Sequence, residues 1–162
     1  MLEIVTLGDE ILRSSTEEIH DIDGEIAKLA ENMLNAMYNG DGIGLAGPQV
    51  GVAKQIFVCH AQNDQPRIFI NPQLIETSQE QIPYEEGCLS LPGIYSDVVR
   101  PLQISVQAFN EKGRPFRLDA DGMLARVIQH EMDHLKGVLF IDHLNEKVRD
   151  KLLKIYGKKH RI

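Results

Sequence analysis

The chain has 162 residues, 43% of them hydrophobic and 25% charged, which suits one folded domain over residues 1–162 and argues against disorder or two ordinary domains. Its first residues lack a signal-peptide pattern and no stretch has the roughly 18 apolar residues of a membrane span, so we expect a soluble, cytoplasmic protein without a membrane partner. The net charge of −7 divides into −12 for residues 1–144 and +5 for residues 145–162. The acidic body argues against nucleic-acid binding, and the basic end suits an anionic partner without sequence specificity.

The first predicted element is a helix that begins after Asp23, as N-cap, and ends at Gly40. Its apolar residues recur at the spacing of one helix face; they are Ile26, Leu29, Ala30, Met33, Leu34 and Met37. The stretch GDGIGLAGPQVG (residues 40–51) follows, and its five glycines and one proline predict a loop whose backbone approaches another group closely.

Short β-branched or aromatic runs predict strands in the middle of the chain. QIFVC (55–59), RIFIN (67–71) and QLIET (73–77) are separated by the turn signals NDQP and NP. VVRPLQISVQAFN (98–110), the turn NEKG and RPFRLDA (114–120) predict a hairpin, with Pro101 and Pro115 at sheet edges or bulges. Because strands and helices do not alternate regularly, we expect an α+β fold with antiparallel sheet.

Two further helices are predicted in the last third of the chain. One runs over residues 121–136 and is capped by Gly137. The other runs over residues 145–156, with Val148, Leu152 and Ile155 as its apolar stripe and Gly157 at its end.

The sequence QHEMDHLKG (129–137) on the first of these helices suggests a metal site. His130 and His134 are four residues apart and therefore lie on one helix face, where both can hold one ion. Glu131 is offset around the helix, so it can reach a metal-bound water without binding the metal. Met123 and Val127 share the histidine face, which points inward as core or as a pocket wall. The alternative is a polar helix face with two unrelated histidines.

A catalytic site of this kind usually has a third protein ligand. The metzincin pattern would need a histidine where Phe140 stands, and Glu146 is the first downstream carboxylate, although a helix-terminal role suits it equally. Cys88, in EEGCLSLPG, would complete a Cys-His-His set, and its alternative is a free core thiol. Cys59 lies in an apolar strand and is interpreted as a small buried hydrophobe.

Three motifs, GIGLAGPQVG (42–51), EGCLSLP (86–92) and QHEMDHLKG, resemble in order and spacing the signature motifs of the peptide deformylases, and the resemblance covers essentially the whole chain. That family removes the N-formyl group from the initiator methionine of nascent polypeptides and releases formate, using a divalent metal that is usually Fe(II) in the cell. The resemblance implies antiparallel sheets packed around a central HExxH helix, with an N-terminal and a C-terminal helix.

The resemblance also implies a role for each motif residue. Cys88, His130 and His134 would be the metal ligands and Glu131 the general acid/base. The side-chain amide of Gln49 and the backbone N–H of Leu89 would stabilise the oxyanion; without the resemblance, Gln49 would be interpreted as a solvated loop residue. Zn, Ni and Co suit the same ligands as Fe(II).

Seven residues are the predicted substrate-binding set: Ile43, Gly44, Tyr84, Glu86, Gly87, Met123 and Val127. Ile43 and Gly44 would border the substrate backbone. Ile43, Tyr84, Met123 and Val127 would form the methionine pocket, for which plain core packing is the alternative. Glu86 would accept a hydrogen bond from a metal ligand and so orient the site; the alternative is an exposed loop carboxylate.

Two residues depart from the family pattern. Gly47 stands where a second alanine is usual, which we expect to loosen the loop around Gln49. Arg126 stands where an apolar residue is often found, and we expect it to point outward or to alter the pocket.

Residues 145–162 are predicted to dock on ribosomal RNA, with a solvated helix face as the alternative. Two other functions remain open: a zinc endopeptidase using HExxH, and a structural metal site in a ribosome-associated module. The second would need a fourth ligand, and His60 and His143 are the remaining histidines considered.

Overall fold

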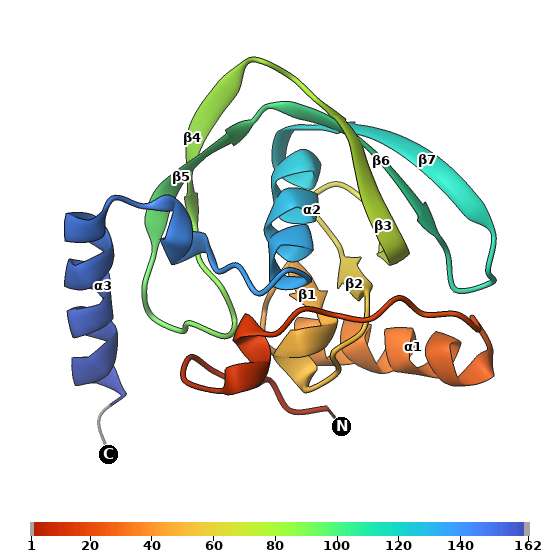
Figure 1. Ribbon diagram of the computed structural model, residues 1–162, viewed down its shortest axis with the longest axis horizontal. Coiled ribbons are helices and arrows are strands. Elements are labelled where there is room, and N and C mark those ends of the chain that lie inside the picture. The colour runs from red at the N-terminus through yellow and green to blue at the C-terminus, as the bar shows by residue number, and fades with distance from the viewer. Residues whose placement is uncertain (1, 161–162) are drawn as a thin grey trace.

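The computed structural model describes residues 2–160 and has an α+β fold with antiparallel sheets (Figure 1). The helices are α1 (Gly24–Asn39), α2 (Gly122–His134) and α3 (Glu146–Lys159), with short 3-10 helices at Glu10–Arg13, Gly47–Val50 and Phe140–His143. The strands are β1 (Gly44–Ala46), β2 (Ile56–Cys59), β3 (Arg67–Thr77), β4 (Gln81–Glu86), β5 (Ser96–Pro101), β6 (Gln103–Phe109) and β7 (Pro115–Asp121). Within residues 2–160, no helix has the length and apolar character needed to cross a membrane.

A five-stranded sheet in the order β1-β2-β3-β6-β7 curves around α2, with its β1–β2 part between α1 and α2, and β4 and β5 form a separate two-stranded sheet. Side chains alternate between the faces of a strand. Ile56 and Val58 of β2 accordingly pack in the cluster that contains α1, whereas Phe57 and Cys59 pack in the cluster that contains α2. Both faces of β2 are covered, which explains why its sequence is continuously apolar.

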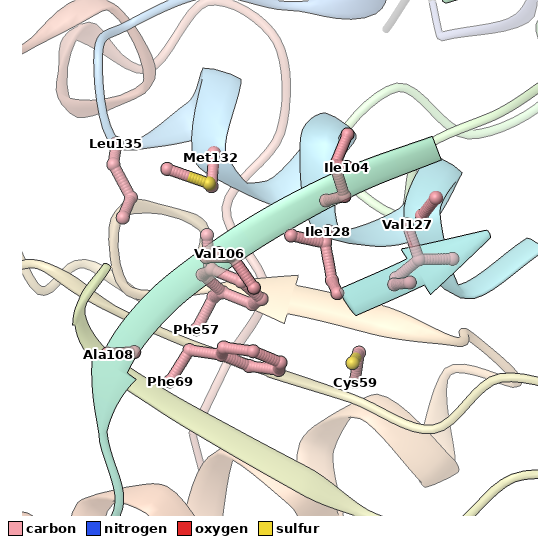
Figure 2. Packing of buried hydrophobic residues seen from close by; sticks show 13 residues of the cluster. Phe57, Cys59, Phe69, Ile104, Val106, Ala108, Val127, Ile128, Met132 and Leu135 are labelled. Atoms are coloured by element: carbon pink, nitrogen blue, oxygen red, sulfur yellow. The ribbon is translucent and has the colours of Figure 1, made fainter. Parts of the chain in front are cut away.

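The core between α2 and the sheet fixes the position of the HExxH helix. Ile128 of α2 points toward Phe57 and Phe69, whose rings stack with centroids 4.5 Å apart (Figure 2). Ile128 and both phenylalanines are fully buried. Because interiors are close-packed, this contact leaves α2 little freedom to shift along the sheet.

The predicted N-terminal helix and the β6–β7 hairpin are confirmed. The Asp23 carboxylate accepts hydrogen bonds from the N–H groups of Glu25 and Ile26, and the helix ends before Gly40. Pro101 ends β5, and Pro115 begins the edge strand β7, where a missing N–H is tolerated.

Two strand predictions were wrong. RIFIN and QLIET are one strand, β3, because Asn71 forms a bulge rather than a turn: its φ is 51° and its side-chain amide exchanges two hydrogen bonds of 2.8 Å with the backbone of Ile19. Residues 98–110 are divided at Leu102 between β5 and β6, which belong to different sheets. The partner of β5 is β4, a strand that we did not predict.

The predicted loop at residues 40–51 contains β1 and a 3-10 helix, so it is more regular than expected. The helix predicted over residues 121–136 is α2, which ends at His134, with Gly137 beyond it at φ 74°. Gly157 does not end α3, which continues to Lys159. Of the predicted stripe, Leu152 and Ile155 pack as expected, together with Leu153 and Tyr156, whereas Val148 is 38% exposed.

The N-terminal strap, defined here as residues 5–17, contacts all three motif segments. The N–H of Val5 donates to the carbonyl of Gln49 at 2.8 Å, and the N–H of Leu7 donates to that of Ser90 at 2.9 Å. The Thr16 hydroxyl donates to the carbonyl of Leu135, just past α2, at 2.8 Å. The strap thus holds the three segments together at their backbones.

Candidate active site

Cys88, His130 and His134 come together as the sequence predicts. Their ligand atoms all lie within 4.8 Å of one another, and Cys88 Sγ lies 3.4 Å from His134 Nε2. The two histidines are 8% and 1% exposed. One thiol and two imidazoles converging in a mostly buried site suit a borderline divalent metal ion, and the donor set therefore fits the metal that the HExxH helix predicts.

Glu86 fixes the orientation of the first histidine. It is 6% exposed, and its Oε1 lies 2.9 Å from His130 Nδ1, so the alternative of an exposed loop carboxylate was wrong. Burial alone would raise the pKa of Glu86, but hydrogen bonds from His130 and Arg100 lower this pKa to about 2. An ionised carboxylate can only accept, so His130 carries its proton on Nδ1 and its Nε2 is left free to bind a metal.

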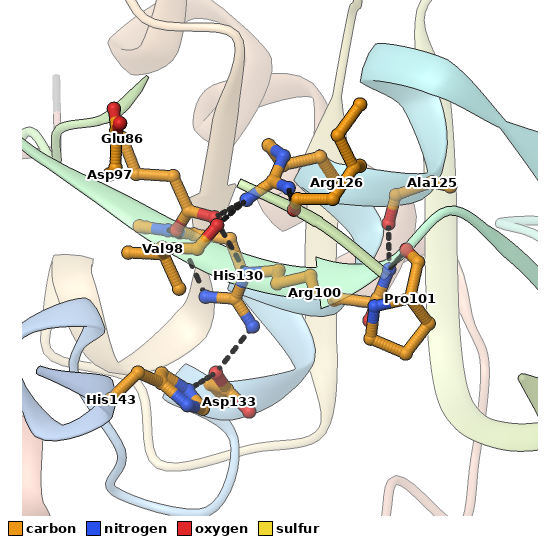
Figure 3. Close-up of polar contacts among 12 residues, drawn as sticks. Glu86, Asp97, Val98, Arg100, Pro101, Ala125, Arg126, His130, Asp133 and His143 are labelled. Atoms are coloured by element: carbon orange, nitrogen blue, oxygen red, sulfur yellow. Dashed lines mark hydrogen bonds and ion pairs between the residues drawn. The ribbon is translucent and has the colours of Figure 1, made fainter. Parts of the chain in front are cut away.

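Two arginines hold Glu86 (Figure 3). Arg100 donates to both carboxylate oxygens, at 2.6 and 2.9 Å, and Arg126 donates to Oε2 at 2.6 Å. Arg100 also donates to Asp133 at 2.9 Å, and Asp133 Oδ2 lies 2.7 Å from His143 Nε2. We did not predict a role for Arg100, although a charged residue inside the apolar run VVRPL was a usable signal.

Of the two expectations for Arg126, the outward orientation was wrong. It is 6% exposed and buried between α2 and the β4–β5 sheet. Tyr84, predicted to line the methionine pocket, is 51% exposed and lies against the Arg126 guanidinium, 5.7 Å from the ring centroid.

Glu131 lies in the cavity with one free oxygen. The residue is 3% exposed, and its Oε1 has no hydrogen-bond partner within the described part of the chain. Burial raises the pKa of Glu131 to about 7. A side chain at Gly44 would collide with Glu131 Oε2 and come within 2.9 Å of Val127 Cγ1, so this glycine makes room for the carboxylate.

Gln49 is 1% exposed rather than solvated. Its Oε1 accepts from the N–H of Ala46 at 2.9 Å, and its Nε2 lies 3.1 Å from Ser90 Oγ and 3.4 Å from Cys88 Sγ. The amide is therefore held with its donor end toward the Cys88 thiol. Ser90 is a contact that we did not predict.

Gly47 does not loosen this loop. A Cβ at this position would lie 2.6 Å from the carbonyl oxygen of Val52 and 2.9 Å from that of Lys54, so the departure from alanine permits tight backbone packing.

A cavity of about 500 Å³ opens beside these groups. Most of the predicted site residues line it: Ile43, Gly44, Gln49, Glu86, Gly87, Cys88, Leu89, Met123, Val127, His130 and Glu131. His134 and Tyr84 are not among the lining residues within the described range. Tyr95 lines the cavity without having been predicted to, and Arg126 lines it in agreement with the expectation that it would alter the pocket.

The fold and this donor set are those of a metal-dependent hydrolase, with the buried Glu131 carboxylate beside Cys88 and His130. The family model of polypeptide deformylase matches residues 1–150, and the chain belongs to that family. It is therefore an enzyme of the deformylase class. This assignment supports neither of the two other functions, the zinc endopeptidase and the non-catalytic metal-binding module.

Relatives and solved structures agree with this assignment. The chain is 49% identical to a peptide deformylase of Prochlorococcus marinus, over 96% of this chain and 79% of the relative. It is 44% identical to one of Chromohalobacter salexigens, over 99% and 95%. The crystal structure of a peptide deformylase from Ehrlichia chaffeensis in complex with actinonin superposes with a TM-score of 0.96 at 38% identity, covering 100% of this chain and 99% of the other. The family is metal-dependent.

Proposed function

We propose that this chain removes the formyl group from the N-terminal formylmethionine of newly made polypeptides and releases formate. The observation that carries the proposal is the buried Glu131 carboxylate, which shares one cavity with Cys88 and His130. Cys88, His130 and His134 would hold one divalent metal ion, and Fe(II) is proposed from the resemblance, since Zn, Ni and Co suit the same donors. When bound, such an ion lowers the pKa of a water and polarises the carbonyl of the substrate.

Glu131 acts as general base and then as general acid. It takes a proton from the attacking water and delivers it to the departing amine nitrogen as the C–N bond breaks, which leaves formate and a free amino terminus. A pKa of about 7 supports both steps, because each protonation state is then populated at neutral pH.

Gln49 and Leu89 stabilise the negative charge that develops on the formyl oxygen. A donor contributes most when it is oriented before the reaction. The bond from the Ala46 N–H to Gln49 Oε1 supports this role, because it prevents the amide from rotating. The backbone N–H of Leu89, next to Cys88 in the cavity wall, is the second donor.

The substrate backbone would pair with β1, which is an edge strand of the five-stranded sheet. Ile43 and Gly44 supply that edge, and Gly87 faces the cavity from the other wall. Ile43, Met123 and Val127 would accept the methionine side chain. Tyr84 is left out of this pocket because its ring lies outside the cavity lining.

We also propose a cytoplasmic location with the ribosome as partner. α3 stands at one side of the molecule (Figure 1), and Lys147, Lys151, Lys154 and Lys158 are exposed along it. Phosphate contacts from such lysines depend steeply on salt. Replacing Lys147, Lys151 and Lys154 with glutamate should abolish cosedimentation with ribosomes at low salt without altering turnover of a short peptide, and unchanged cosedimentation would refute the contact.

The main test is anaerobic formate release from a formyl-Met peptide, with metal content measured on the same sample. We expect about one metal per chain and turnover that is lost on chelation. A metal-loaded, folded protein without formate release would overturn the proposal.

A further inference from the structure

The metal-ligand set is assembled from two parts of the molecule that are distant in sequence. His130 and His134 lie on α2, whereas Cys88 lies two residues beyond the end of β4. β4 and β5 form their own sheet and share no strand pairing with the five-stranded sheet. The position of Cys88 relative to the histidines therefore depends on how this two-stranded sheet is attached to α2.

Arg126 joins α2 to both strands of that sheet with a single side chain, in addition to the Arg100–Asp133 ion pair. It lies on α2, one turn before His130, and donates to the carbonyl of Ile82 on β4 at 2.7 Å and to that of Val98 on β5 at 2.8 Å. Its third bond, of 2.6 Å, goes to Glu86 at the end of β4 (Figure 3). These three acceptors all belong to the β4–β5 sheet, and the planar guanidinium holds several donors in one fixed geometry.

The charge balance of the buried cluster, which consists of Glu86, Arg100, Arg126 and Asp133, indicates that Arg126 is needed. Glu86 and Asp133 carry two negative charges, and Arg100 and Arg126 carry two positive ones. The Glu86, Arg100 and Arg126 side chains are 5%, 4% and 7% exposed, so little water is present to compensate a missing partner. Loss of Arg126 would leave an excess negative charge beside His130.

We propose that Arg126 is a positioning residue that fixes Cys88 relative to His130 and His134, and so determines how firmly the metal is held. It acts through Glu86 and the β4–β5 backbone rather than on the reacting atoms. The inference rests on the proposed metal site. Groups that support metal ligands from behind typically change metal retention by about 10- to 100-fold when they are removed.

The test uses Co(II) as a probe, since the absorption of the thiolate–cobalt bond reports Cys88 directly. Wild type, Arg126→Met and Arg126→Lys are loaded with Co(II), and its loss to excess chelator is followed. We expect Arg126→Met to lose Co(II) at least about tenfold faster than wild type. Arg126→Lys should lie between them, because one ammonium group cannot reach all three acceptors.

Two controls separate this role from general destabilisation. Arg117→Met removes an exposed arginine of β7, whose side chain is 53% exposed, and Leu29→Ala weakens the core between α1 and the sheet, away from Arg126. Both should release Co(II) at the wild-type rate. In metal-free protein, Cys88 should also react faster with a thiol reagent in Arg126→Met than in either control.

The inference is overturned if Arg126→Met releases Co(II) as slowly as wild type, or if Leu29→Ala with an equal loss of Tm releases it as fast as Arg126→Met. If Arg126→Met does not fold, a wild-type release rate in Arg126→Lys also overturns it. A wild-type protein that binds no Co(II) through Cys88 would instead refute the proposed metal site.

Discussion

Gly47 offers a direct test of how tightly the Gln49 loop is packed. In Gly47→Ala, the new Cβ would lie 2.6 Å from Val52 O and 2.9 Å from Lys54 O. Cβ atoms in proteins essentially never approach another heavy atom to less than 3.0 Å. Both neighbours are backbone atoms, so the loop must move by at least a few tenths of an ångström. Overpacking of this kind costs about 1–3 kcal/mol, and each kcal/mol lowers Tm by about 2–4 °C in a chain of this size.

The same shift reaches the active site, because Gln49 lies in the 3-10 helix that begins at Gly47. Losing an oxyanion donor completely lowers kcat by about 10²- to 10³-fold, so a displaced Gln49 should lower kcat by less than this, with KM nearly unchanged. The assays are thermal unfolding and formate release at saturating substrate. Gly157→Ala is the matched control, because a Cβ there meets nothing within 4 Å in α3, and it should stabilise by up to about 1 kcal/mol. Wild-type Tm and kcat in Gly47→Ala would refute the reasoning.

Three further predictions follow from the site and the core. Glu131→Gln should lower kcat by about 10²- to 10⁴-fold with metal content and Tm retained, and a smaller loss would remove Glu131 from its acid/base role. Gly44→Ala should displace the Glu131 carboxylate and push on Val127, so kcat should fall far more than Tm; equal losses would indicate a purely structural glycine. Burial raises the pKa of the Cys59 thiol from 9.0 to about 12, so iodoacetamide should modify Cys59 only after unfolding, as mass spectrometry would show. Because the unfolded thiol ionises first, stability should fall as pH rises above about 9, and Cys59→Ala should remove that slope.

The parts of the molecule that sequence could predict depend on local spacing. α1, the β6–β7 hairpin and the HExxH helix follow from periodicities and caps within some twenty residues. The pairing of His130 with His134 needs only the geometry of one helix turn. Cys88 was a candidate third ligand from its residue type, with a free core thiol as the alternative, and the role of Gln49 came from the resemblance, since nothing in their immediate neighbours determines that they face this helix.

The parts that could not be predicted depend on long-range contacts. β4 was missed because QIPYEE is short, mostly exposed and interrupted by Pro83, and because it becomes a strand only by pairing with β5. Arg126 and Glu86 are 40 residues apart, so their ion pair has no sequence period. From the sequence alone, Arg126 therefore looks like an exposed departure from the family pattern, because the carboxylate that pairs with it comes from a distant segment of the chain.

The N-terminal strap has a consequence for the order in which the enzyme is made and becomes active. Its residues leave the ribosome first, yet its partners at Gln49, Ser90 and Leu135 lie 44 to 119 residues later in the chain. Contacts this distant form late, because the intervening chain must first lose its conformational freedom. The active site of this enzyme, which is proposed to act on other nascent chains, can thus be completed only after residue 135 of its own chain has been synthesised.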